Sequence, residues 1–204
     1  ISKETGLLKQ WPEGGPPLVW KASGAGAGYS SFAISQGRLY TMGLRGDREF
    51  IIAFDIANGK EVWATPHGGA FRNDRGDGPR GTPTLDGDRL YALGGNGDLS
   101  SLDLKTGKVV WECSGLGANV IPAPVTDKGI VYAMSGFRNP NLLAIRPGEG
   151  DLTGSKNILW TNQRGNSYTA SPVLADGKLY FISDNGMLSC LNAATGEPYY
   201  IQQR

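Results

Sequence analysis

The sequence predicts an all-β fold in which one four-stranded unit occurs four times, and three observations support this. A proline, or in one case Phe32, stands eight residues before each of four tyrosines, Tyr40, Tyr91, Tyr132 and Tyr180. Large aromatic residues close the units at intervals of 43 residues (Trp20 to Trp63), 48 (to Trp111), 49 (to Trp160) and 40 (to Tyr200). No stretch of the chain combines helical periodicity with helix caps.

The second unit shows how each element follows from the local sequence. Residues 90–93 form a continuous apolar run, which is typical of a strand buried on both faces. The sequence GGNG at 94–97 predicts a hairpin turn, because glycine and asparagine tolerate positive φ angles. Residues 98–104 alternate as a half-buried strand. Asp103 and Gly107 then predict a tight turn before an outer strand, KVVW, that ends in a large ring.

Short antiparallel strands, four to a unit, are typical of β-propeller blades, which cover each other's faces. We divide the chain into a lead-in (1–15), an outer strand (16–23) and four blades at about 24–66, 67–114, 115–162 and 163–204. An aromatic ring at the end of an outer strand can wedge between blades and bury on the order of 200 Å². We therefore predict structural docking roles for Trp20, Trp63, Trp111, Trp160 and Tyr200.

Composition excludes several classes of function. The chain has 20 basic and 19 acidic residues, with no Lys/Arg run longer than two, so nucleic-acid binding is not expected. Apolar stretches are too short to span a bilayer. Cys113 and Cys190 stand alone, with Cys190 expected in the core and Cys113 nearer the surface. His67, the one histidine, has no catalytic or metal-binding partner at a diagnostic spacing, so neither catalytic residues nor a metal site are expected.

Loops that lead into the innermost strands of a propeller crowd around its central channel. Tyr29, Arg80, Asn119 and Tyr168 occupy equivalent places in these loops, so we predict that they form a ligand or partner rim. Two tyrosines, an amide and a guanidinium could bind an extended peptide or a carbohydrate. Alternatively, they are turn residues that satisfy backbone groups. The segment 146–157 is expected to lie at a blade's edge, either contacting a partner or disordered.

The repeated turn-and-tryptophan phrase resembles a known motif. SLDLKTGKVVW (101–111) and AFDIANGKEVW (53–63) resemble the tryptophan-docking motif of PQQ-like quinoprotein propellers, and the resemblance covers residues 18–202. That group includes PQQ-dependent alcohol and glucose dehydrogenases and the non-catalytic BamB-like scaffolds of outer-membrane β-barrel assembly. The resemblance implies a ring of eight blades, of which this chain would form half, and a periplasmic or cell-surface location.

The resemblance to the enzymes of this group is incomplete. They hold PQQ beside a Ca²⁺ ion, with vicinal cysteines and a stacking tryptophan, whereas this sequence has no adjacent cysteines and its tryptophans are assigned to docking. We therefore expect a non-enzymatic, cofactor-free extracytoplasmic scaffold for protein or envelope-polymer partners, with a protein or a second copy completing the ring. The alternative is part of a PQQ-dependent alcohol dehydrogenase-like oxidoreductase whose PQQ and Ca²⁺ site lies outside this chain.

Overall fold

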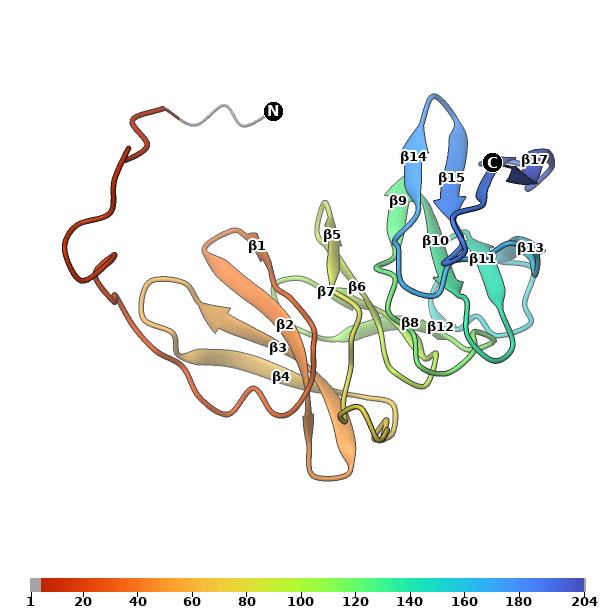
Figure 1. Cartoon of the computed structure of the whole chain (residues 1–204). Helices are drawn as coiled ribbons and strands as arrows, with labels where there is room; N and C mark the ends of the chain where they lie inside the picture. Colours follow the sequence, from red (N-terminus) through yellow and green to blue (C-terminus); the bar gives the residue numbers. More distant parts are fainter. Residues whose placement is uncertain (1–4, 204) are drawn as a thin grey trace.

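The computed structural model describes residues 5–203. All regular secondary structure in these residues is β-strand (Figure 1). The first two sheets contain β1 (Ala33–Ser35), β2 (Arg38–Arg45), β3 (Arg48–Asp55) and β4 (Glu61–His67), then β5 (Thr84–Asp86), β6 (Arg89–Leu93), β7 (Leu99–Asp103) and β8 (Val109–Cys113). The last two contain β9 (Val125–Asp127), β10 (Ile130–Ser135), β11 (Asn141–Ile145) and β13 (Ile158–Asn162), then β14 (Val173–Ala175), β15 (Lys178–Ile182), β16 (Leu188–Asn192) and β17 (Pro198–Gln203).

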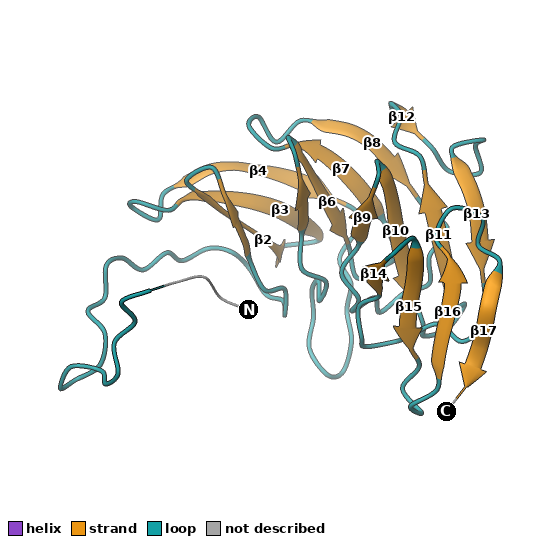
Figure 2. Cartoon of the chain, turned by 90° about the horizontal axis from the view of Figure 1, so that it is seen from above, coloured by secondary structure: helices purple, strands orange, loops and turns teal. Residues whose placement is uncertain are grey.

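Within each sheet the four strands lie in sequence order and pair antiparallel. Figure 2 shows the four sheets following one another in an open arc, with β4, β8, β13 and β17 toward its outer side. The innermost strands of neighbouring sheets meet, since β1 contacts β5 and β9 contacts β14. The prediction of an all-β chain with four propeller blades is confirmed.

The apolar runs are explained by burial between sheets. Leu90 and Ala92 of β6 pack in a cluster with Tyr40 and Ile51 of the first sheet. Leu93, whose side chain lies on the other face of β6, packs in a second cluster with residues of the third sheet. Because successive strand residues face opposite sides and both sides are covered, β6 is apolar at nearly every position.

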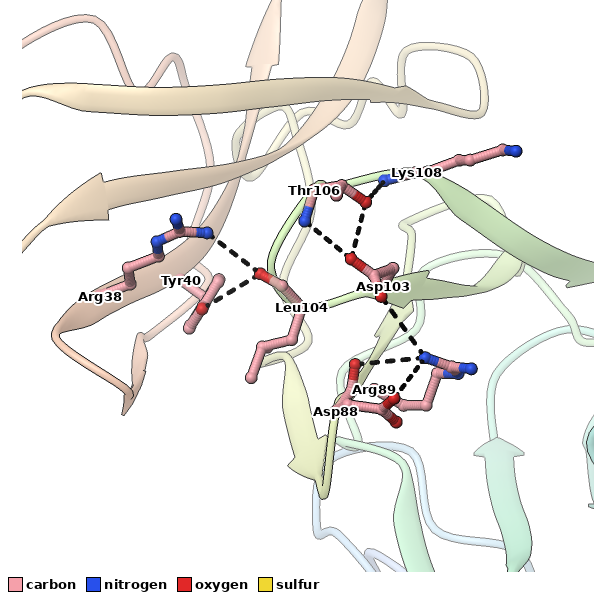
Figure 3. A network of polar contacts seen from close by, with 8 residues as sticks. All are labelled: Arg38, Tyr40, Asp88, Arg89, Asp103, Leu104, Thr106 and Lys108. Carbon is pink, nitrogen blue, oxygen red and sulfur yellow. Dashed lines mark hydrogen bonds and ion pairs between the residues drawn. The ribbon is translucent and has the colours of Figure 1, made fainter.

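The predicted turn at 103–107 forms as a compact hydrogen-bonded unit (Figure 3). Asp103 Oδ1 accepts hydrogen bonds from the backbone N–H (2.8 Å) and the hydroxyl (2.6 Å) of Thr106. Gly107 has a φ of 71°, and its N–H donates to the Asp103 carbonyl at 2.9 Å. The hydrogen bonds from Thr106 also hold the pKa of the Asp103 carboxyl below its usual value. The turn therefore sets the direction in which β8 leaves.

The expected outer strand at 16–23 is not formed. The residues are largely exposed, with Val19 83% exposed, and belong to the N-terminal arm (Figure 1). The arm contacts the first sheet through Trp20, whose indole N–H donates to the Ile56 carbonyl at 2.7 Å. A strand needs a neighbour for its backbone hydrogen bonds, and no described segment pairs with this one. Residues 1–4 of the lead-in, and Arg204, lie outside the described residues.

The structure also differs from the expectations for Cys113 and for the segment 146–157. Cys113 is 2% exposed rather than near the surface, because its side chain points into the cluster between the second and third sheets. The segment 146–157 is ordered by pairing: β12 (Gly150–Asp151) runs parallel to β8 and becomes a fifth strand of the second sheet. Leu152 beside it is buried in the same cluster as Cys113. This edge is therefore covered from within the chain.

Candidate functional site

Three of the predicted docking tryptophans lie directly on a glycine of a neighbouring turn. A Cβ atom added to Gly107 would stand 2.5 Å from Cδ2 of Trp63, which leaves no room for a side chain. Trp20 covers Gly59 and Trp160 covers Gly196 in the same way, at 2.6 Å from the nearest ring atom. Because these glycines have no side chain, the indole rings can pack directly against the backbone of the turn.

The remaining two docking candidates have different surroundings. Trp111 is 1% exposed and packs with Leu152, because the loop after β11 replaces the Asp-to-Gly turn in the third unit. Tyr200 is half-buried in β17. A tyrosine accompanies each internal tryptophan at ring-centroid distances of 5.8 to 5.9 Å, in the pairs Tyr40–Trp63, Tyr91–Trp111 and Tyr132–Trp160. That these rings are what holds the sheets together stays a prediction.

Side chains of one sheet also donate hydrogen bonds to the turn of the next. Tyr40 Oη donates to the Leu104 carbonyl at 3.3 Å, and Tyr132 Oη donates to the Ala193 carbonyl at 2.9 Å. Arg38 Nη1 donates to the Leu104 carbonyl across the same boundary (Figure 3). It also donates to the Lys105 carbonyl at 2.6 Å. The turns therefore link neighbouring sheets by directional hydrogen bonds.

The four predicted rim residues line one pocket of about 270 Å³. They come from the four loops that precede β1, β5, β9 and β14, which is why residues up to 139 positions apart, Tyr29 and Tyr168, meet there. Asn73, Arg75 and Ile121 complete the lining. Sequence reasoning missed these three, although the nearness of Asn73 and Arg75 to Arg80 along the chain was an available signal.

Arg80 is held rigidly at this pocket. Its Nη1 and Nη2 atoms donate to the carbonyls of Gly78 (2.9 Å) and Gly76 (2.8 Å). Its guanidinium carbon lies 5.4 Å from the ring centroid of Tyr29 and 4.7 Å from that of Phe71, within cation–π range. In the described part of the chain no carboxylate lies within ion-pair distance of Arg80.

The opposite wall is made by Asn119 and Tyr168. Asn119 Nδ2 donates to Tyr168 Oη at 2.6 Å. Because that hydroxyl accepts a hydrogen bond from the amide, its own hydrogen can be donated to another group. The Tyr168 ring packs on Phe137 at a centroid distance of 5.1 Å, which fixes its orientation. The wall thus offers an aromatic face and one hydroxyl donor.

A separate buried polar cluster lies between the first and second sheets. Glu49 and His67 are register partners in β3 and β4, and each is 1% exposed. Glu49 Oε2 accepts the Gly95 N–H at 3.0 Å, and His67 Nδ1 is 2.9 Å from Ser100 Oγ. Burial raises the pKa of Glu49 to about 7 and lowers that of His67 to about 4. Sequence reasoning had assigned His67 no partner.

The donor atoms of the pocket do not fit PQQ with Ca²⁺. A Ca²⁺ ion takes six to eight oxygen ligands, usually including carboxylates, whereas this pocket is lined by two arginines and no acidic residue. Across residues 5–203, no three His, Cys, Asp or Glu side chains gather as a potential metal site. Cys113 and Cys190 are buried in different sheets, so they form no vicinal pair.

None of the described residues form a helix long and apolar enough to cross a membrane.

The four antiparallel sheets define a β-propeller fold, and the family model that the chain matches is one of PQQ-like repeats. The chain belongs to the family described as outer membrane protein assembly factor BamB, whose model matches residues 13–203. The protein of that name from Moranella endobia (strain PCIT) is 30% identical over 157 residues, which are 74% of this chain and 39% of that protein. Its Legionella pneumophila (strain Paris) counterpart is 25% identical over 71% of this chain and 33% of its own length.

The chain therefore spans between a third and two fifths of the length of these curated relatives. Among solved structures, BamB from Moraxella catarrhalis is similar over 86% of this chain and 62% of its own, with 18% identity and a TM-score of 0.58. The quinohemoprotein alcohol dehydrogenase ADHIIG from Pseudomonas putida HK5 is similar over 90% and 35%, with 16% identity and a TM-score of 0.64. At these identities the structural likeness shows the fold alone, as part of larger propellers.

Proposed function

We propose that this chain is a non-enzymatic scaffold module that binds a protein partner outside the cytoplasm, through the four-loop pocket lined by Tyr29, Arg80, Asn119 and Tyr168. The observation that carries the proposal is the meeting of all four side chains at one pocket that lacks carboxylates. Membership of the BamB family supports a role in outer-membrane assembly and an envelope location.

Site-specific photocrosslinking tests the proposal. A photoreactive amino acid placed at position 168, inside the pocket, is expected to form a discrete adduct with an envelope protein in membrane extracts. The same amino acid at position 146, an exposed site on a different loop, serves as the control and is expected to form none. Equal crosslinking from both positions, or none from position 168, would contradict binding at this pocket.

The second candidate function is part of a PQQ-dependent alcohol dehydrogenase-like oxidoreductase, which the likeness of its fold to the Pseudomonas putida alcohol dehydrogenase favours. Because the PQQ and Ca²⁺ site of this candidate would lie outside the chain, the chain is incubated with PQQ and Ca²⁺ together with the partner or copy that completes the ring, and is then desalted. The scaffold proposal predicts that no quinone absorbance is retained. Retained absorbance together with alcohol-dependent dye reduction would replace the scaffold with the enzyme.

A further inference from the structure

We infer that the four-loop pocket recognises a carboxylate that an extended peptide presents next to an apolar side chain. This inference rests on the proposed function, because it names the chemistry by which the scaffold would recognise its protein partner. Three features of the pocket carry it: two guanidinium groups with no carboxylate among the lining residues, a hydroxyl donor and apolar walls.

The first feature is positive charge with no carboxylate among the lining residues, although Asp77 and Glu49 interact with Arg80 from outside the pocket. Two of the five N–H groups of Arg80 donate to loop carbonyls, which leaves three without a hydrogen bond to the described residues. The Arg75 side chain also lines the pocket, is exposed, and makes no side-chain hydrogen bond or ion pair within residues 5–203. Of the two acidic residues of this loop, Asp77 is paired with Arg72 at 2.8 Å, and Asp74 is exposed and does not line the pocket. The pocket thus attracts an anion.

The second feature is the geometry of the donors. Stacking against Tyr29 and Phe71 and two carbonyl hydrogen bonds fix the Arg80 guanidinium before any ligand binds. A planar guanidinium held in this way matches a carboxylate, since both groups are flat and can form two parallel hydrogen bonds. The free Tyr168 hydroxyl adds a donor from the opposite wall. A preordered donor set loses little conformational entropy on binding.

The third feature is the size and polarity of the rest of the pocket. About 270 Å³ is several times the roughly 30 Å³ that one water molecule occupies in the liquid. A lone inorganic anion would leave most of this space unfilled. The ring faces of Tyr29 and Tyr168 and the side chain of Ile121 suit an apolar group beside the carboxylate. Asp or Glu flanked by an apolar residue in an extended segment satisfies both requirements.

Calorimetric titration with two matched peptides tests the inference. The probe is acetyl-Gly-Phe-Glu-Phe-Gly-amide, and the control replaces its Glu with Gln, so only the charge changes. We expect the Glu peptide to bind about tenfold more tightly, since charge-assisted hydrogen bonds are roughly twice as strong as neutral ones. Equal affinity for both peptides, or no heat from either, would overturn the inference. A digalacturonate that binds more tightly than the Glu peptide would also overturn it, in favour of an acidic sugar.

Variants of the pocket locate the binding. Arg80→Gln is expected to lower affinity for the Glu peptide about tenfold, with partial recovery in Arg80→Lys. Because Arg80 also fixes its own loop, Arg75→Gln provides a variant whose side chain holds nothing in place, and it should lower affinity as well. Arg146→Gln, an exposed arginine elsewhere, should change nothing. Unchanged affinity in both Arg80→Gln and Arg75→Gln would place the peptide elsewhere.

This experiment can fail independently of the proposed function. Photocrosslinks from position 168 combined with no discrimination between the peptides would retain the scaffold and reject carboxylate recognition. Tighter binding of the Glu peptide without any crosslinked partner would retain carboxylate recognition and reject the scaffold.

Discussion

At the scale of single residues, Gly107 and Gly196 lie beneath tryptophan rings of the preceding sheet, Trp63 and Trp160. Gly107 and Gly129 have nearly the same left-handed backbone, with φ of 71° and 74°, but only Gly107 has a ring against it. Gly129→Ala should therefore cost about 1 kcal/mol for the backbone conformation alone. Gly107→Ala should cost about 1–3 kcal/mol more, because Trp63 must move. Urea unfolding measures both, and equal losses would contradict a tight ring-on-glycine contact.

The buried pair Glu49 and His67 gives a prediction about pH. The pKa of Glu49 rises from 4.5 to about 7 on folding, so the folded state holds an extra proton and this contribution to stability falls as pH rises through that range. The pKa of His67 falls from 6.5 to about 4, so its contribution is lost as pH falls through that range. Between pH 4.5 and 6.5 the two contributions oppose each other.

Glu49→Gln removes one of these opposing contributions. The free energy of unfolding of this variant should therefore rise with pH between 4.5 and 6.5 more steeply than that of the unsubstituted chain, because only the His67 contribution remains. Urea unfolding at several pH values measures the slope. Glu149→Gln, at an exposed site, controls for the loss of one acidic group. The same slope in all three proteins would show that Glu49 does not take up a proton on folding.

At the scale of elements, β12 is a stabilising part of the second sheet. The Leu152 N–H next to it donates to the Glu112 carbonyl of β8 at 2.8 Å, and the Leu152 side chain is 4% exposed. We expect slow amide hydrogen exchange at Leu152 by NMR and fast exchange at Gly154, whose N–H forms no backbone hydrogen bond within the described residues. Leu152→Ala should cost about 2–4 kcal/mol. Fast exchange at Leu152 would instead indicate a disordered excursion.

The elements also show what sequence could predict. The turn at Asp103 and Gly107 was predictable because its hydrogen bonds and its positive φ are local properties of these residues. The pairing of β12 with β8 was not, because it joins segments about 40 residues apart with no shared pattern. The strand expected at 16–23 is not formed for a related reason: the local sequence does not supply the neighbour that a strand requires.

The candidate site was partly predictable on the same grounds. Equivalent positions in a repeat lead to equivalent places in the fold, so Tyr29, Arg80, Asn119 and Tyr168 were found. Arg75 was missed because the bend of its loop depends on contacts specific to that loop, such as the backbone N–H of Asn73 donating to the Asp77 carboxylate. The pairing of His67 with Ser100 spans two sheets and has no sequence signature.

At the scale of the whole molecule, the first and fourth sheets each have one face without a neighbouring sheet in the described chain. On the fourth, Val173 and Ile182 share a face and are 60% and 43% exposed. Exposed apolar patches of this kind favour association. We expect the purified chain to sediment above its 21.7 kDa mass, and Val173→Lys with Ile182→Lys to shift it toward the monomer. Leu8→Lys, on the N-terminal arm, should have no effect, and a monodisperse monomer would contradict the prediction.

Binding through the four-loop pocket is the central claim, and hydrogen–deuterium exchange of the chain with its crosslinked partner tests it most directly. The account predicts that protection on binding is concentrated in the loops around Tyr29, Arg80, Asn119 and Tyr168. These loops lie at one end of the innermost strands. Protection confined to the outer strands β4, β8, β13 and β17, with these four loops unchanged, would contradict it.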